Sequence, residues 1–586
     1  MLDVLFVNST EALTVQREVN GTMLLATKLL EAGFQVDILR FCQIDHYQEN
    51  YRAFLTDAVE KILAKKPQCV SFYTLCVYFH VMLGIARELK KADPGIIVIF
   101  GGPQATLTAE VTLQSMDCVD YVCAGEGENT IVPFIQALLR EKNPDYSKVP
   151  GLYYRKQGTV VQNPLPPMTD LNTLPYWDLR LHGPVSMAEL TNDPENQYMP
   201  IDAGRGCPFN CTFCCTSTVL NHSYRLKSAS RITEDIMHYQ KTYGINKFWL
   251  SHDALTTNKR LIEELCDCIL AAGLNIKWRC TTRIDLITED LVLKMKRAGL
   301  TMIDFGIETG SVRMQKITNK RLDLEKTRQM VSFLMKNKIR VMSYFIYGFP
   351  EETREDLNDT LEMVLSMLDD GMPYASIAFC RFFPRTKITQ QHYDDLVLEE
   401  DMKINFRDMF GSEEELPMIR ENKMLFSFFY HLHTPVRDAY PYVHFLVQVY
   451  RRFPRTARYL RGLYRGDNVK FYEDLYACNQ DFFQSQGAYV NSGASMDPLQ
   501  MLYRVIDGLD VPFGRQLKAL LQFDWDLQIL SRSRNDTKRI AEYDFSFLDY
   551  QKKRPIEEYC CAKTKLLLQK SGEKTAIQLL SIKAEE

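Results

Sequence analysis

The chain has 586 residues, of which 46% are apolar and 25% are charged, and its formal net charge is −4. This length is typical of about three or four domains, and the negative charge lacks the basic field that attracts nucleic acid, so we expect no nucleic-acid partner. The first strand begins with no charged n-region before it, and no uncharged apolar run reaches about 18 residues. We therefore expect a cytoplasmic protein with neither a secretory signal nor a membrane span.

Residues 1–145 alternate short apolar strands with helices. Strands are expected at 2–7, 35–41, 69–74, 96–102 and 119–128, and helices at 21–33, 52–65 and 78–92. This alternation predicts a doubly wound parallel sheet with a Rossmann-like fold. In such sheets, ligands bind beyond the carboxyl ends of the strands.

The residues at those strand ends are small, polar or glycine. The candidate ligand contacts are Asn8, Ser9, Thr10, Tyr73, Thr74, Leu75, Gly101, Gly102, Gly125, Glu126 and Gly127. One glycine pair alone is typical of a tight turn. Several pairs at one sheet edge favour a crevice for a large flat ligand.

Residues 146–197 are predicted to form a connector. A hairpin is expected around Gln157-Gly158, and the stretch after it holds four prolines and shows little periodicity. Because proline removes backbone donors, we expect an extended crossing here rather than a separate domain.

Residues 198–400 resume the strand-helix pattern, with strands expected at 198–204, 247–253, 276–283, 302–310, 340–350 and 374–383. Six repeats predict a partial (β/α)6 barrel whose chemistry lies at the carboxyl ends of the strands. Residues 401–586 are predicted to be mostly α-helical, and we expect this region to cover the substrate. Its basic, aromatic stretch at 445–466 favours a helix surface with snorkelling arginines over an anion site.

Three of the 16 cysteines form a distinctive loop. Cys207, Cys211 and Cys214 have the spacing CxxxCxxC within the segment RGCPFNCTFCC at 205–215. A structural zinc site needs four ligands, usually in two pairs, and no second CxxC follows. Three thiolates on one short loop suit a 4Fe-4S cluster with one iron left open for a cosubstrate. We treat Cys215 as a packing residue.

This loop, with Phe213 before its last cysteine, resembles the cluster loop of the radical S-adenosylmethionine (radical SAM) superfamily. The resemblance implies that S-adenosylmethionine chelates the open iron and is cleaved to a 5′-deoxyadenosyl radical. It also implies a partial βα barrel, which agrees with the repeat count, and an external electron donor of the flavodoxin or ferredoxin type.

Other strand ends of the barrel resemble the cosubstrate contacts of the same superfamily. Asp253 lies where that superfamily places groups that face the amine of S-adenosylmethionine, although the usual Gly-Gly-Glu is replaced here. The further contacts implied are Arg283 for the carboxylate, Glu308 and Gly310 for the ribose, and Gly348 and Pro350 for the adenine.

Residues 1–180 resemble the cobalamin-binding domain that precedes one class of radical SAM enzymes, through segments such as VLFVNST, IIVIFGGPQAT and VDYVCAGEGENT. The DxHxxG loop that supplies a lower axial histidine in other corrinoid enzymes is absent after the first strand, and His46 and His80 lie elsewhere. The resemblance therefore implies a base-off cobalamin, and we expect Tyr73, Thr74 and Leu75 near its lower face.

By this resemblance the chain is a cobalamin-dependent radical SAM enzyme, and we expect a C-methyltransferase acting on an unactivated carbon of a natural-product or peptide substrate. Small-molecule, carrier-bound and peptide substrates stay open, and so does ring formation or rearrangement with the same cofactors. The alternative from another class is a redox sensor that binds the cluster and the corrinoid without catalysis. Methylthiolation of a tRNA base is disfavoured, because the further cysteines and RNA-binding module of that family are not seen.

Overall fold

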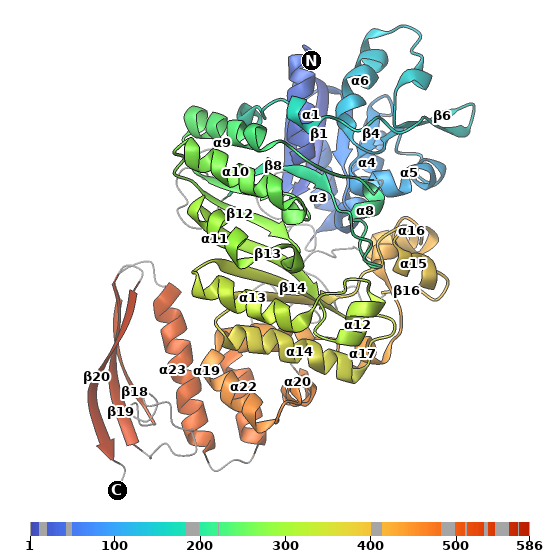
Figure 1. Ribbon diagram of the computed structural model, residues 1–586. Coiled ribbons are helices and arrows are strands. Elements are labelled where there is room, and N and C mark those ends of the chain that lie inside the picture. The colour runs from blue at the N-terminus through green and yellow to red at the C-terminus, as the bar shows by residue number, and fades with distance from the viewer. Residues whose placement is uncertain are drawn as a thin grey trace.

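The computed structural model describes residues 2–10, 20–42, 50–182, 198–220, 222–399, 413–481, 498–509, 513–532, 537–544, 562–571 and 574–584. Three parts follow one another along the chain: an N-terminal α/β domain, a barrel-like parallel sheet and a C-terminal region (Figure 1). Within the described ranges, no helix is both long and apolar enough to cross a lipid bilayer.

The N-terminal domain is built on a seven-stranded sheet with the order β2-β1-β3-β4-β5-β6-β7. Its parallel strands are β1 (Leu2–Thr10), β2 (Val36–Cys42), β3 (Pro67–Tyr73), β4 (Ile97–Gly101) and β5 (Tyr121–Cys123). Helices α1 (Asn20–Glu31) and α6 (Ile131–Arg140) cover one face, and α3 (Tyr51–Ala64), α4 (Phe79–Ala92) and α5 (Pro103–Ser115) cover the other. Helices on both faces confirm the predicted doubly wound sheet.

The hairpin that we predicted within the connector extends this sheet. Strand β6 (Leu152–Lys156) pairs antiparallel with β5, and β7 (Thr159–Gln162) pairs with β6. Arg155 of β6 explains the attachment, because its guanidinium donates to the carbonyls of Leu113, Met116 and Val119. These bonds hold the hairpin beside the end of α5 and cover the edge of β5.

The second part is a six-stranded parallel sheet with the order β15-β14-β13-β12-β11-β8, as the six repeats predicted. Its strands are β8 (Met199–Asp202), β11 (Lys247–Ser251), β12 (Lys277–Thr282), β13 (Leu300–Glu308), β14 (Arg340–Tyr347) and β15 (Tyr374–Phe379). The helices between them are α9 (Ala229–Tyr243), α10 (Lys259–Ala271), α11 (Glu289–Arg297), α13 (Leu324–Lys336) and α14 (Arg354–Asp369). Each crossover returns the chain in the same direction, so all six carboxyl ends lie at one edge.

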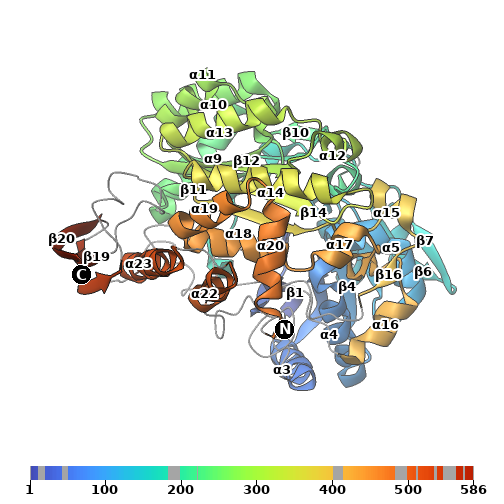
Figure 2. The same ribbon diagram turned by 90° about the horizontal axis from the view of Figure 1, so that it is seen from below.

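The C-terminal region contains the predicted helices and a sheet that we did not predict. The helices include α18 (Val443–Arg452), α19 (Pro454–Leu463), α20 (Asn468–Ala477), α22 (Pro498–Gly508) and α23 (Gly514–Arg532). Strands β18 (Thr537–Tyr543), β19 (Ala562–Ser571) and β20 (Lys574–Ala584) form an antiparallel sheet at the far end from the first domain (Figures 1 and 2).

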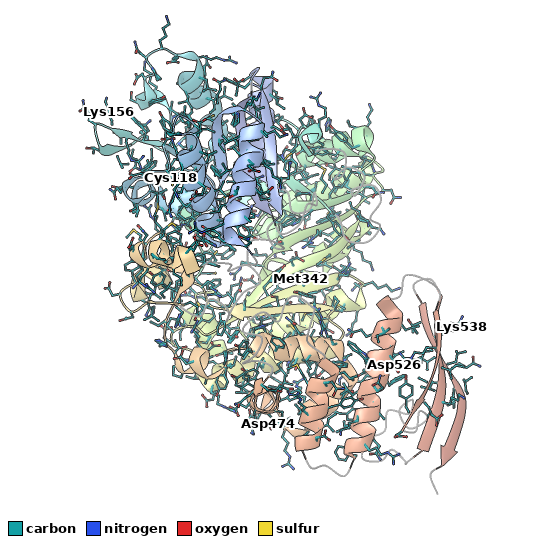
Figure 3. The ribbon with its side chains drawn as sticks, turned by 180° about the vertical axis from the view of Figure 1, so that it is seen from behind. Cys118, Lys156, Met342, Asp474, Asp526 and Lys538 are labelled. Carbon is teal, nitrogen blue, oxygen red and sulfur yellow. The ribbon has the colours of Figure 1, made fainter. Side chains whose placement is uncertain are left out.

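Polar contacts join these C-terminal elements to their neighbours. Asp526 on α23 accepts a hydrogen bond from Tyr543 Oη at 2.7 Å and pairs with Arg539 at 2.9 Å, which holds β18 against the helix (Figure 3). In the basic stretch, Arg461 pairs with Asp369 of α14 at 2.7 Å. This arginine therefore lies on the surface of a helix, as predicted for the basic stretch, and fixes α19 to the barrel.

Residues 413–434, which we call the return segment, pack against the first domain. They include α16 (Leu416–Glu421) and place the ring of Phe426 5.7 Å from that of Phe79 on α4. Gln104 Nε2 of α5 donates to the Leu425 carbonyl at 2.8 Å. The apolar core below α3, α4 and α5 is therefore completed by a segment more than 300 residues later in the chain.

Replacing Phe134 by alanine should destabilise the first domain by about 3–5 kcal/mol, because it empties a fully buried site. Phe134 packs edge-on against Tyr121 and Tyr146, with ring centroids 5.1 and 6.2 Å away. The measurement is the urea midpoint of the N-terminal unfolding transition. Leu293→Ala, at a side chain that is 40% exposed, is the control and should change the free energy of unfolding by less than about 0.5 kcal/mol. Equal midpoints for the two variants would contradict this packing.

Candidate functional site

A cavity of about 440 Å³ lies between the carboxyl edges of the two parallel sheets. It brings together several residues predicted from the sequence: Tyr73, Gly101, Gly102, Gly125, Glu126 and Gly127 of the first domain and Asp253 of the barrel. Ligands of open parallel sheets bind at this kind of edge. Here two such edges face one another across one space.

Gly102 on the first edge has no room for a side chain, and a side chain at Gly127 would have to displace that of Leu25. A Cβ at Gly102, where φ is 100°, would lie 2.9 Å from the Thr74 carbonyl oxygen. A Cβ at Gly127 would lie 2.8 Å from Leu25 Cδ1. At both positions the backbone itself forms part of the cavity wall.

Other predicted residues of the first domain serve its internal structure. Thr74 is buried, donates to the Gly101 carbonyl at 2.9 Å and accepts from the Ala105 amide at 3.0 Å. Asn8 is buried and accepts from Thr22 Oγ1 at 3.1 Å. Neither side chain lines the cavity.

The remaining predictions for this domain have simpler outcomes. Leu75 is also absent from the cavity wall, and the side chains of Ser9 and Thr10 lie outside the described residues, as does all of His46. His80 is buried on α4 with Nε2 3.9 Å from Glu415 of the return segment, so it belongs to the packing there.

A partly buried ion network joins the two domains beside the cavity. Arg205 Nη2, on strand β9 (Gly204–Gly206), donates to Glu128 Oε1 at 2.6 Å and to Asp202 Oδ2 at 2.8 Å. Arg205 Nη1 lies 3.4 Å from Glu126 Oε1, which also accepts from Arg225. Burial lowers the pKa of Arg205, but its carboxylate partners hold that pKa well above its usual range. The arginine is therefore charged and fixes the second domain to the glycine-rich edge of the first.

The charged residues that line the cavity are mostly acidic: Glu126, Glu128, Asp202 and Asp253, with Arg205 as the one arginine or lysine of the described wall. Burial raises the pKa of Asp253 to about 6. Glu128 is 5% exposed, and its Oε2 has no hydrogen-bond partner among the described residues. The wall thus offers negative charge and an unused acceptor to a ligand.

The cysteine loop lies between β9 and α8 (Thr216–Val219) and is braced by backbone contacts. The Thr212 amide donates to the Thr318 carbonyl at 3.0 Å, and the Ile388 amide donates to the Thr212 carbonyl at 3.0 Å. Asn319 Nδ2 donates to the Asn210 carbonyl at 2.8 Å. The segment after α12 (Val312–Ile317) and helix α15 (Lys387–His392) therefore both hold the cysteine loop.

Cys207, Cys211 and Cys214 are half-buried on this loop and belong to no disulfide. Burial raises the pKa of Cys211 to about 11, while Lys320 and Arg283 oppose that rise. Burial also raises the pKa of Cys215, to about 12, and Cys215 interacts electrostatically with Cys76 of the first domain. Among the described residues, no group of three or more His, Cys, Asp or Glu side chains surrounds a single metal ion. In a 4Fe-4S cluster, by contrast, each cysteine binds a different iron.

Two cations lie beside the thiols, and only one of them, Arg283, could be predicted from the sequence. Arg283, expected at the cosubstrate carboxylate, donates to Asp285 at 2.9 Å and lies 4.0 Å from the ring centroid of Phe209. Lys320 is buried, and its Nζ donates to Glu308 Oε1 at 3.0 Å. Lys320 carries no recognisable motif of its own, so only the fold brings it to the cysteines.

The predicted glycines at the ends of β13 and β14 lie near the cysteine loop and not in the cavity wall. A Cβ at Gly310 would overlap the Asp359 carbonyl, and Gly348 has a φ of 76°. Phe349, which follows Gly348, places its ring 5.8 Å from that of Phe213 on the cysteine loop. Pro350 is half-buried directly after it.

Glu352 is a second residue that the sequence analysis missed. It is buried, and its Oε2 accepts from the amides of Gly348 and Phe349. Burial raises the pKa of Glu352 to about 8, although both amides oppose the rise. This carboxyl holds the turn after β14 in place.

Comparison with known proteins yields two family models. The radical SAM superfamily matches residues 201–364, and the B12 binding domain matches residues 18–135. An uncharacterized methyltransferase, PH0819, of Pyrococcus horikoshii is 27% identical over 424 residues, which cover 70% of this chain and 86% of that protein.

Two further proteins are similar to this chain at lower sequence identity. The anaerobic magnesium-protoporphyrin IX monomethyl ester cyclase of Rubrivivax gelatinosus is 25% identical, covering 59% of this chain and 62% of the cyclase. Among solved structures, the cobalamin-dependent S-adenosylmethionine radical enzyme OxsB superposes with a TM-score of 0.56 at 15% identity, covering 91% of this chain and 82% of OxsB. The OxsB likeness concerns the fold.

Replacing Arg205 by methionine should lower the free energy of unfolding by about 3–5 kcal/mol, because it leaves Glu128 and Asp202 without their cation and takes one of two cations from Glu126. The urea midpoint of the full chain measures the change. Arg52→Met is the matched control, since Arg52 pairs with Glu414 at 3.0 Å but its side chain is 80% exposed, and it should cost less than about 1 kcal/mol. A midpoint for the Arg205 variant equal to that of the control would contradict the role of the network.

Proposed function

Since this chain is a radical SAM enzyme with an N-terminal B12-binding domain, we propose that it transfers a methyl group to an unactivated carbon of a natural-product or peptide substrate. One observation carries the proposal: the glycine-rich edge of the first sheet and the barrel edge beside the cysteine loop face one cavity. A methyl donor on one edge and a radical source on the other would then act on the same substrate atom.

The cysteine loop fits a 4Fe-4S cluster. Cys207, Cys211 and Cys214 would bind three irons and leave the fourth for S-adenosylmethionine. Lys320 and Arg283 fit this assignment, because they favour the thiolate form of Cys211 that binds metal. Cys215 faces the first domain and would stay outside the ligand set.

The barrel edge fits S-adenosylmethionine, which carries positive charge on its sulfonium and its amine. Asp253 would hold the amine, as predicted from the sequence. Arg283 would hold the carboxylate, as the resemblance implies, with Lys320 as a second cation beside the thiols. Glu308 and Gly310 would serve the ribose, and Gly348 and Pro350 the adenine.

The first edge fits cobalamin. Tyr73 belongs to the cavity wall and would lie near the lower face of a base-off corrinoid, as the resemblance implies. Cobalamin carries primary amides around its ring, and the unused Oε2 of Glu128 would accept from one of them.

When bound, these cofactors supply a carbon-centred radical and a transferable methyl group. The protein residues would position them. Arg205 and its carboxylates hold the two edges together, and the return segment closes the far side of the first domain.

Ring formation is the second candidate, favoured by the similarity to a cyclase. Product analysis with labelled S-adenosylmethionine separates the two, because only methylation transfers the label to the product.

Anaerobically reconstituted wild-type protein should contain about four irons and four sulfides and should form 5′-deoxyadenosine from S-adenosylmethionine when reduced. Cys211→Ala should lose the brown colour of the cluster and this product. Cys215→Ala is the matched control on the same loop and should keep both. Cluster and corrinoid without S-adenosylmethionine cleavage in the wild type would favour the redox sensor.

Replacing Glu128 by glutamine should weaken cobalamin binding about tenfold, because an amide donor would then face the amides of the corrin. Equilibrium dialysis of the full chain measures the affinity. A corrinoid with carboxylates in place of those amides is the control ligand, and the same variant should bind it more tightly than wild type does. Equal changes for both ligands would contradict the assignment of Glu128.

A further inference from the structure

The barrel sheet has an inner face, turned away from its helices, that continues from the cavity. Within the described strands, β8 and β15 stand at opposite ends of the sheet and do not pair with one another, so the inner face is an open trough. The strand registers align Asp202 with Ser251, and Thr281 with Asp304, Met342 and Tyr374. The first three of these residues line the cavity, and the last two carry the same layer of side chains to the far side of the trough.

Strand β14 turns alternate side chains toward this trough. Val341 and Phe345 are buried in the core that lies under the helices, whereas Met342, Tyr344 and Ile346 point to the inner face. Inward side chains normally fill the middle of a parallel barrel. Tyr344 is nevertheless 38% exposed. An exposed aromatic ring at an inward position marks space that a ligand can occupy.

The ring of Tyr344 is held in a defined orientation. Its hydroxyl donates to the Sδ atom of Met342, which is labelled in Figure 3, at 2.8 Å. Because the two residues are two positions apart on one strand, this bond lays the ring along the strand and turns one of its faces to the trough. The neighbouring strand leaves room beside the ring, since Ser376 pairs in register with Tyr344 and Ala378 with Ile346. A flat surface with small neighbours suits a flat ligand.

The trough has a polar side and an apolar side. Asp202, Ser251 and Thr281 are its side chains next to the cavity, whereas β14 and β15 add Tyr344 and Tyr374, the second of which is 36% exposed. The carboxyl end of β14 leads on to Phe349, whose ring lies 5.8 Å from that of Phe213 on the cysteine loop. A ligand on the apolar side would therefore lie along the strand that leads to the cysteines.

We propose that the inner face of β14 binds a planar, conjugated ring of the substrate, with Tyr344 as the stacking platform and Met342 beneath it. The inference rests on the proposed function, which requires a substrate without defining its class. Aromatic rings stack in offset geometry, and methionine sulfur makes favourable contacts with them. Carboxylates line the adjoining cavity, so the part of the substrate that enters it is neutral or cationic.

Binding of naphthalene-2-carboxamide to the full chain, titrated by NMR, tests the proposal without catalysis. Decahydronaphthalene-2-carboxamide is the control ligand, because it has the same amide but a puckered, saturated ring. Tyr344→Ala should weaken binding of the flat probe about tenfold, whereas Tyr344→Phe should keep it within about twofold because the ring remains. Tyr243→Ala changes a partly exposed tyrosine on the outer helix α9 and should bind the probe as wild type does.

Methionine labelled with carbon-13 at its methyl group reports where the probe binds. The Met342 signal, assigned by its absence in Met342→Leu, should shift when the flat probe is added, because an aromatic ring current acts on a methyl group beside it. Equal affinity for the saturated analogue, an unmoved Met342 signal or no binding of the flat probe to wild type would each overturn the proposal. Failure of the reconstituted wild type to cleave S-adenosylmethionine would instead overturn the proposed function, since neither binding measurement needs the cofactors.

Discussion

The ion network around Arg205 is the interaction on which the rest of the site depends. Arg205 lies two residues before Cys207, and its partners Glu126 and Glu128 belong to the other domain. Charge-assisted bonds from a planar guanidinium tolerate little change in geometry. The glycine-rich edge therefore cannot shift without moving the strand that enters the cysteine loop. Neither domain positions its ligand alone, because each edge takes its alignment from the other.

This coupling gives the cavity its chemical character. The carboxylates that hold Arg205 also line the space, so the same residues fix the domains and leave a surplus of negative charge. A cationic cosubstrate suits that surplus, and a corrin ring with amide donors suits the free oxygen of Glu128.

Much of the fold could be predicted from the sequence, because buried parallel strands such as LDVLFV and IIVIFGG are continuous apolar runs between helices. The cysteines and Asp253 could be found too, since their positions follow from spacing and from strand ends. Glu128 and Lys320 could not be singled out, because their surroundings come from segments distant in the chain. The last sheet was missed for a different reason: β19 and β20 mix lysine, glutamine and leucine, a composition that also suits a surface helix.

The return segment has a consequence for biosynthesis. Gln104 and Leu425 are 321 residues apart, and Phe79 is covered only when Phe426 reaches it. Contacts of such long range form late in folding, so the first domain leaves the ribosome with an open apolar groove. Chimeras that exchange only this domain between related enzymes would inherit the same unfilled groove. A functional exchange would therefore have to transfer the first domain and the return segment together.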